Sequence, residues 1–416
     1  MTEPQPLPQR EPDAISEDDM PTVPIPARKV VTTFDAASRH ERLEVKPPLT
    51  RLFRRTITKA FSVWLKFSTA LVRSLDWYPR VEPYVGYGTE HYSRLICRTV
   101  YGPFKRQAGR LIRGIRGMLM VPSPHTKVRI AIDDVPIETV QVGASEVYDA
   151  IDSNPDISSE FAASDDAGYL DLVAEHSLEP GIHNVSYKVR SRKPVNANLF
   201  TIPSGTKVGV ISDVDDTIMV TQAPRLMKAA YNLLLLNPRK KVPVASMNLL
   251  FNRIADMFPD APFFYLSTSP WNVESSIRHF ITNHGFPEGP LLLRDLDPRP
   301  KTFIPSGVQH KLEYAEQLMA DFPDMKFILI GDDGQKDPTT YATIARRYPG
   351  RVLAICIRQL TPREVAGNIG SVAGRANTQP MPVTDVPVFT GATGSNIMKT
   401  MLPYLRATQA ADGRND

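Results

Sequence analysis

The sequence has 416 residues, which is enough for two or three domains, and a formal net charge of +4 at pH 7. This near balance leaves no overall basic footprint, so we expect no nucleic-acid partner. Its two cysteines, Cys97 and Cys356, lie far apart, which argues against a disulfide scaffold or a zinc site and fits a reducing cytosol. The start of the chain is acidic and proline-rich, unlike a secretory signal, and no apolar stretch is long enough to span a bilayer. We therefore expect a cytoplasmic protein whose contact with a membrane would be peripheral.

Residues 1–45 are rich in proline and charge and poor in bulky apolar residues, so we expect a disordered tail. Residues 46–125 are strongly basic, and we expect them to form an amphipathic helical region. From Leu52 to Leu75 apolar residues recur at spacings of mostly three and four, which predicts a helix with an apolar face opposite a basic one. Such a helix either packs on a core with its basic face in water or lies on an anionic membrane. A second basic helix is expected over residues 104–120.

Residues 126–203 show the alternation of apolar and polar positions that is typical of strands. Val128, Ile130 and Ile132 form one such set, and glycine-containing turns separate it from later ones. This pattern predicts a small antiparallel β domain, most simply a sandwich. It has no cluster of catalytic residue types, so we expect it to serve recognition or packing.

Short apolar runs alternate with helical stretches from Lys207 onward. This order is typical of βαβ units, and it predicts an α/β domain over residues 204–375 with a Rossmann-like parallel sheet covered on both faces. Ligands of such sheets bind beyond the carboxyl ends of the strands. Residues 376–416 are expected to form a C-terminal tail.

The motif from Asp213 to Thr217 follows the first of these apolar runs. Residues two apart in an extended segment point the same way, so Asp213 and Asp215 can face one pocket. Two neighbouring carboxylates repel, and either a divalent cation or a retained proton relieves that repulsion. A phosphatase that works through an aspartyl-phosphate uses both solutions. The alternative is a solvated acidic turn.

Three further segments place polar residues at strand ends or helix starts. Ser267 follows an apolar run and can bind phosphate oxygens, although serine is also an ordinary helix cap. Lys311 opens a helical stretch, where it is unfavourable for the helix dipole unless an anion holds it there; its alternative is a solvated surface lysine. Asp332 and Asp337 follow another apolar run and can complete the oxygen octahedron that Mg²⁺ prefers, or else form an acidic turn.

With these residues the chain resembles the haloacid-dehalogenase-like superfamily of aspartate-nucleophile phosphotransferases. The resemblance implies that Asp213 is the nucleophile and Asp215 the general acid/base, with Thr217 steadying the loop. It also implies that Ser267 and Lys311 bind the phosphoryl group. Mg²⁺ would be held by Asp213, the backbone carbonyl of Asp215 and Asp332.

A narrower resemblance is to the catalytic domain of the actin-patch phosphatidate phosphatases of fungi and their bacterial relatives. It covers residues 205–360 and is carried by Asp213-Val-Asp-Asp-Thr-Ile218, Ser267-Thr-Ser-Pro-Trp-Asn272, Leu293-Arg-Asp295, His310-Lys311 and Gly331-Asp-Asp-Gly-Gln-Lys-Asp337. Asp333 stands where a serine is usual, which leaves open whether Asp333 or Asp337 joins Asp332 at the metal.

These features together predict a Mg²⁺-dependent phosphomonoester hydrolase. The segment between Thr217 and Phe263 is too short for a large cap domain, so the site would be open to a bulky substrate. With the helix at Leu52–Leu75, this favours a lipid phosphate such as phosphatidate at an anionic membrane. The alternatives are a phosphatase of a soluble phosphomonoester and a catalytically silent module that binds a membrane or partner. The sequence does not specify an oligomeric state.

Overall fold

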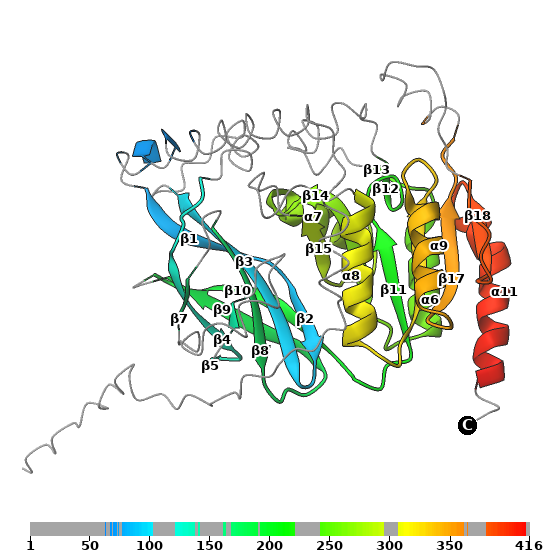
Figure 1. The fold of residues 1–416 in the computed structure, drawn as a ribbon, viewed down its shortest axis with the longest axis horizontal. Coiled ribbons are helices and arrows are strands. Elements are labelled where there is room, and N and C mark those ends of the chain that lie inside the picture. Colours follow the sequence, from blue (N-terminus) through cyan, green and yellow to red (C-terminus); the bar gives the residue numbers. More distant parts are fainter. Residues whose placement is uncertain are drawn as a thin grey trace, which may run out of the picture.

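Two large β-sheets lie side by side in the molecule (Figure 1). The computed structural model of the chain describes residues 77–102, 121–137, 140–141, 161–163, 168–189, 192–220, 242–294, 307–361 and 380–412, a few helical positions between 63 and 74, and Glu364. One sheet is parallel and carries helices on both faces. The other comes earlier in the chain and is mostly antiparallel.

The parallel sheet has six strands in the order β15-β14-β11-β16-β17-β18. Their bounds are β11 (Val208–Asp213), β14 (Phe263–Pro270), β15 (Leu291–Arg294), β16 (Lys326–Asp332), β17 (Val352–Arg358) and β18 (Val388–Gly391). Every neighbouring pair is parallel. The strands read as continuous apolar runs because both of their faces are buried. The expected α/β class with a parallel sheet is confirmed.

Helices cover the two faces of this sheet. One core contains side chains of α6 (Met247–Met257), α7 (Glu274–Asn283) and α11 (Gly394–Asp412). The other contains side chains of α8 (Gly307–Asp321) and α9 (Asp337–Arg347). The short helix η3 (Trp271–Val273) precedes α7, and β12 (Met219–Val220) pairs with β13 (Val242–Pro243) as a small hairpin.

The C-terminal residues differ from the expected tail at 376–416. They contain β18, which pairs with β17, and α11, whose side chains Ile397, Met401 and Leu405 are buried against the sheet. Burial of one side chain per turn anchors this helix. Gly394 and Pro403 weaken the helical signal of α11 in the sequence, because both residues have low helix propensity.

The second sheet links ten strands in the order β5-β4-β9-β10-β2-β3-β8-β6, with β1 on β3 and β7 on β4. The strands are β1 (Tyr78–Pro83), β2 (Gly86–Thr89), β3 (Tyr92–Gly102), β4 (Lys127–Ile132), β5 (Val135–Pro136), β6 (Val140–Gln141), β7 (Phe161–Ala163), β8 (Tyr169–Glu175), β9 (Gly181–Lys188) and β10 (Val195–Ile202). Only β2 and β10 pair in parallel, so the sheet is mixed but mostly antiparallel. A layered sandwich stays a prediction.

Strands β1 to β3 lie within the 46–125 region that was expected to be helical. The long strand β3 is buried along nearly its whole length. A strand covered on both faces has no alternation of apolar and polar residues, so period two does not mark it in the sequence. Two of the basic residues of this region, Arg94 and Arg98, are buried inside this strand.

Several expectations fall outside the described residues, namely the tail at 1–45, most of the helix at Leu52–Leu75 and the second basic helix at 104–120. The described positions from Val63 to Ser74 are helical. Val72 packs with Tyr101 and Val121 in a small apolar cluster. Among the described residues, no helix is long and apolar enough to cross a membrane.

Candidate active site

The carboxyl ends of three neighbouring strands bring the expected site residues together. Asp213 ends β11, Ser267 lies on β14 and Asp332 ends β16. Lys311 comes from α8 and Asp337 begins α9, which follows β16 after a tight turn. This edge of a parallel sheet is where ligands of such folds bind.

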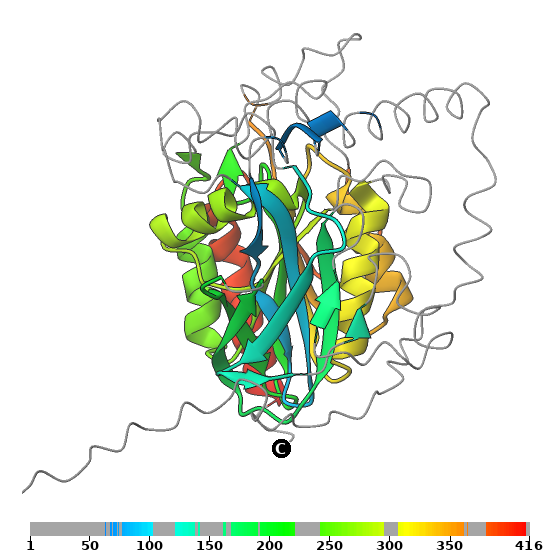
Figure 2. The ribbon, with the colours of Figure 1, turned by 90° about the vertical axis from the view of Figure 1, so that its left-hand side faces the viewer.

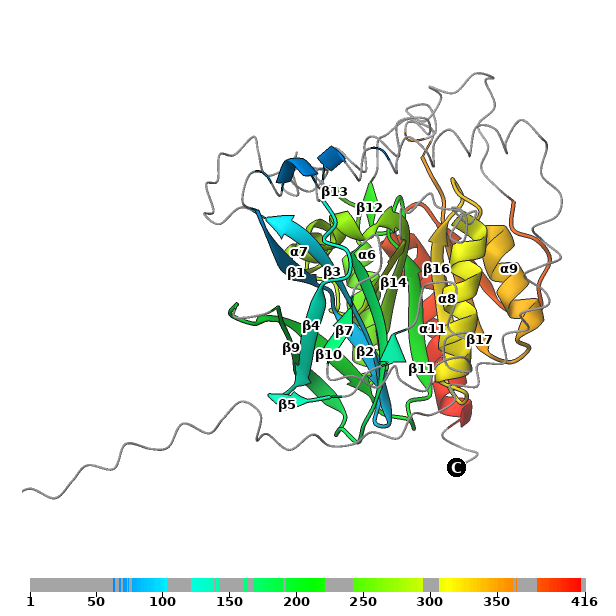
Figure 3. The same cartoon turned by 60° about the vertical axis from the view of Figure 1, so that its left-hand side comes forward.

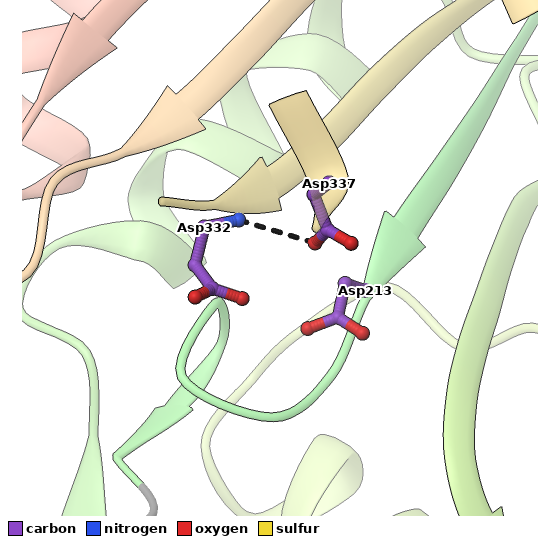
Figure 4. A group of neighbouring side chains, drawn as sticks. All are labelled: Asp213, Asp332 and Asp337. Carbon is purple, nitrogen blue, oxygen red and sulfur yellow. Dashed lines mark hydrogen bonds between the residues drawn. The ribbon is translucent and has the colours of Figure 1, made fainter. Parts of the chain in front are cut away.

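Three buried carboxylates form the centre of the site (Figure 4). One oxygen from each of Asp213, Asp332 and Asp337 lies within 4.8 Å of the other two. The Lys311 ammonium is 2.7 Å from Asp213 Oδ1 and also pairs with Asp337 Oδ1. The backbone N–H of Asp332 donates to Asp337 Oδ2 at 3.3 Å. We call Asp213, Asp332, Asp337 and Lys311 the carboxylate cluster.

The charges of this cluster are not balanced by the protein alone. Burial raises the pKa of Asp213 to about 8, with Lys311 opposing the shift and Asp337 and Asp215 adding to it. Burial and the nearby carboxylates Asp337 and Asp213 also raise the pKa of Asp332 well above its usual range. Burial alone would lower the pKa of Lys311, but the attraction of the carboxylates outweighs it and the net pKa is raised.

The donor set fits a hard divalent cation. One ammonium faces three buried carboxylates, so ionising all three leaves a net negative charge in a site of low polarity. A bound cation reverses this penalty, because its charge favours the ionised acids. Carboxylate oxygens are the ligands that Mg²⁺ prefers in proteins.

Asp215 lies in a separate hydrogen-bonded pocket beside the cluster. Its Oδ2 accepts from Ser267 Oγ at 3.0 Å and from Ser269 Oγ at 3.2 Å. The Ser269 backbone N–H donates to Ser267 Oγ at 3.0 Å, which fixes the two hydroxyls relative to each other. Thr217 Oγ1 donates to Asp213 Oδ2 at 3.1 Å and ties the start of the loop to its end. All the expected site residues therefore meet at one edge of the sheet.

Comparison with known proteins agrees with this geometry. Residues 208–359 match the family described as "Phosphatidate phosphatase APP1, catalytic domain". These residues belong to the APP1 catalytic-domain family. The matched range contains every member of the carboxylate cluster as well as Asp215, Thr217 and Ser267.

Two curated relatives cover similar shares of the chain. This chain is 29% identical over 208 residues to Phosphatidate phosphatase APP1 of Saccharomyces cerevisiae. The alignment covers 49% of this chain and 35% of the yeast protein. The chain is 26% identical over 184 residues to an uncharacterized protein of Schizosaccharomyces pombe, covering 44% of this chain and 30% of that protein. The chain thus spans about a third of the length of these relatives.

Similarity to solved structures is low. The Yersinia pseudotuberculosis adhesin InvE aligns with a TM-score of 0.17 and 13% identity, covering 30% of this chain and 32% of the adhesin. A TM-score of this size bears on neither fold nor function.

In the APP1 catalytic domain of this chain, Asp337 and not Asp333 faces the other two carboxylates. Asp333 Oδ1 accepts from the Leu360 backbone N–H at 2.9 Å and holds the segment after β17. Asp337 comes close because Gly331 has no side chain, and a Cβ there would collide with the Asp337 carboxylate and the Tyr341 ring.

Two residues of this APP1 domain were not predicted as part of the site. Gln335 Nε2 donates to the Asp215 carbonyl at 3.0 Å and to Asp332 Oδ2 at 3.2 Å, so it links the two acidic loops. Arg358 ends β17, and its Nη1 donates to the Asp216 carbonyl at 2.8 Å. Arg358 is a charged residue that closes a fully apolar strand, which marks it as unusual without revealing its partners; Gln335 gives no comparable signal.

Proposed function

We propose that the chain is a Mg²⁺-dependent phosphomonoester hydrolase that forms an aspartyl-phosphate on Asp213 and acts on a lipid phosphate such as phosphatidate. The observation that carries the proposal is the buried carboxylate cluster beside the Asp215 pocket, at the edge of the sheet in a domain of the APP1 family. The same arrangement supports the finer assignment to the haloacid-dehalogenase-like superfamily.

The proposed reaction has two steps. An oxygen of Asp213 bonds to phosphorus as the bond from phosphorus to the alkoxide oxygen breaks, and the carboxyl proton of Asp215 passes to that oxygen. Water then attacks the aspartyl-phosphate, Asp215 takes a proton from it, and Asp213 is released with inorganic phosphate. Ser267 and Lys311 bind the phosphoryl oxygens during both steps.

The residues that would hold Mg²⁺ are Asp213, Asp332 and the backbone carbonyl of Asp215, with Asp337 next to them. When bound, the ion would supply positive charge against the charge on the phosphoryl oxygens. Lys311 adds a fixed positive charge, since its pairing with two carboxylates keeps it protonated.

A phosphate-release assay tests the reaction. The purified chain is given short-chain phosphatidate, lysophosphatidate or soluble phosphomonoesters, with Mg²⁺ or with a chelator. We expect release from the lipid phosphates with Mg²⁺ only. Asp213→Asn should reduce it by roughly 10³-fold or more, because the nucleophile is lost.

The matched control is Asp333→Asn, an identical chemical change in the loop next to Asp332. Its Oδ1 can still accept from Leu360, so activity should stay near wild type. Full activity of Asp213→Asn would disprove the mechanism. Release from soluble phosphomonoesters alone would assign a soluble substrate, and no release from any substrate would favour a silent binding module.

The described helical positions between 63 and 74 support peripheral contact with an anionic membrane. Val63, Phe67 and Leu71 are 65%, 64% and 49% exposed, whereas Ser68 and Val72 are buried. At 100° per residue the exposed apolar trio forms one stripe, whose centre lies about 120° around the helix from that of the buried pair. The sequence around this stripe is rich in lysine and arginine, which anionic lipids attract.

The stripe also lies at the end of the molecule that carries the site. In Figure 3 this helix, the β12–β13 hairpin and the carboxyl end of β11 are all at the upper end. Figure 1 places them at the same end, and Figure 2 again shows the blue helix and the small green strands near the top. A membrane bound there would present its head groups on the side of the carboxylate cluster.

Vesicle flotation tests this contact. Phe67→Ser with Leu71→Ser should lower binding to anionic vesicles by at least about tenfold, because two large apolar side chains are lost from the interface. Ile182→Ser is the control, since Ile182 is 62% exposed but lies on β9 of the second sheet. Equal binding of the double variant and wild type would refute the contact.

A further inference from the structure

An aromatic contact joins the second sheet to the strand that carries the site serines. Tyr84, in the link between β1 and β2, stacks on Trp271 with ring centroids 4.7 Å apart and an interplanar angle of 24°. Each of these residues is only 4% exposed. Ile96 and Tyr169 of the second sheet belong to the same core as Trp271, so the contact is part of a shared apolar interface.

The serines that bind Asp215 lie in an irregular part of β14. Leu266 pairs with Leu292 of β15, and the next pair is Pro270 with Arg294, so four steps along β14 match two along β15. Two extra residues are therefore accommodated between Leu266 and Pro270. In such a bulge the ladder is interrupted, and strand pairing alone does not set the direction of the side chains.

Support for this bulge comes from its C-terminal end. Trp271 follows the bulge directly and opens η3. Its indole ring is held on one side by Tyr84, whose backbone N–H is in turn bonded to the Ile96 carbonyl at 3.1 Å. The Tyr84 hydroxyl is buried and has no hydrogen-bond partner among the described residues. The ring face of Tyr84, and not its hydroxyl, therefore makes the contact with Trp271.

We propose that Tyr84 is a positioning residue of the active site. By stacking on Trp271 it holds the β14 bulge so that the hydroxyls of Ser267 and Ser269 reach Asp215. The second sheet is then part of the support of the catalytic pocket. The catalytic consequence rests on the function proposed above, whereas the effect on the bulge does not.

The interface supplies a matched control. Tyr87, on β2, is 1% exposed and packs edge-on against Phe264 at 5.6 Å between ring centroids. Its hydroxyl donates to Asp321 Oδ2 at 3.3 Å, at the end of α8. Tyr87 thus belongs to the same interface but packs in the core on the opposite face of the parallel sheet from Trp271.

Hydrogen exchange of the full chain without substrate tests the positioning directly. Tyr84→Leu should speed amide exchange in residues 265–273 at least about tenfold, because the bulge then opens more often. Tyr84→Phe keeps the ring and should exchange like wild type. Tyr87→Leu should leave this segment unchanged. Wild-type protection in Tyr84→Leu, or equal loss in Tyr84→Phe, overturns the proposal whatever the activity of the chain.

Phosphate release then tests whether Tyr84 acts on catalysis through Ser267 and Ser269. We expect Tyr84→Leu to lower kcat about tenfold with KM nearly unchanged, and Tyr84→Phe to restore it. Tyr84→Leu combined with Ser269→Ala should be no slower than Ser269→Ala alone, because both changes remove the same contact. If the losses of kcat in the two single variants instead add in the double variant, Tyr84 does not act through Ser269. If Tyr84→Leu does not fold, Trp271→Phe replaces it, because the smaller ring reduces the stacking contact with Tyr84. The same changes in hydrogen exchange and in kcat are then expected.

Discussion

At the scale of single residues, the acids of the site were predictable and the residue that braces their loop was not. Asp213 and Asp332 follow apolar runs, and parallel strands deliver such residues to one edge. Arg358 gains its role from partners that no spacing reveals. Its Nη1 donates to the Asp216 carbonyl, and its Nη2 donates to both carboxylate oxygens of Glu364 at 2.6 and 2.7 Å. Asp216 has a φ of 60°, a left-handed conformation that few side chains favour.

The first prediction at this scale concerns Arg358. Its side chain is 3% exposed, and lysine has a single nitrogen, so it cannot bind Glu364 and the Asp216 carbonyl through two separate nitrogens as Arg358 does. We expect Arg358→Lys to destabilise the fold by about 3 kcal/mol, as is usual for a broken buried pair, and to reduce phosphate release with it. Urea unfolding measures this change in the free energy of unfolding. Arg253→Lys is the control, because its pair with Asp256 is exposed and should change stability by less than about 0.5 kcal/mol. Equal stabilities of the two variants would contradict this role.

At the scale of elements, the alternating strands and helices of the parallel sheet were clear in the sequence, but its last strand and helix were not. The helix α11 is identified by its contacts. Met401 is fully buried and lies against Cys356 on β17, 3.0 Å between the two sulfur atoms. Residues Val388–Asp412 therefore complete the sheet and cover one of its faces, although they lie beyond the range that matches the family.

The prediction at this scale is that α11 stabilises the parallel sheet. Met401→Ala should cost about 2–5 kcal/mol of unfolding free energy, because it leaves a cavity between α11 and β17. Lys399→Ala, an exposed position two residues earlier, should change stability little. Thermal unfolding of both variants measures the difference. A neutral Met401→Ala would mean that α11 is not anchored on the sheet as described.

At the scale of the whole molecule, the sequence indicated two separate β-containing regions and gave no sign that they share a core. Alternation and periodicity report which face of each element is buried, but they do not report what buries it. The stack of Tyr84 on Trp271 is a contact between residues nearly two hundred positions apart, and local patterns in the sequence do not reveal such a contact.

The core shared by the two sheets limits where the chain can be cut to give a fragment that folds. The stretch recognised by family comparison, residues 208–359, ends before β18 and begins after Tyr84. A fragment cut at those limits would expose the indole of Trp271 and the sheet face that Met401 covers, and exposed apolar patches of this kind drive aggregation. The smallest piece of this chain that folds on its own is therefore expected to be larger than residues 208–359. Exchanging those residues alone between relatives would also require matching the surfaces on which they pack.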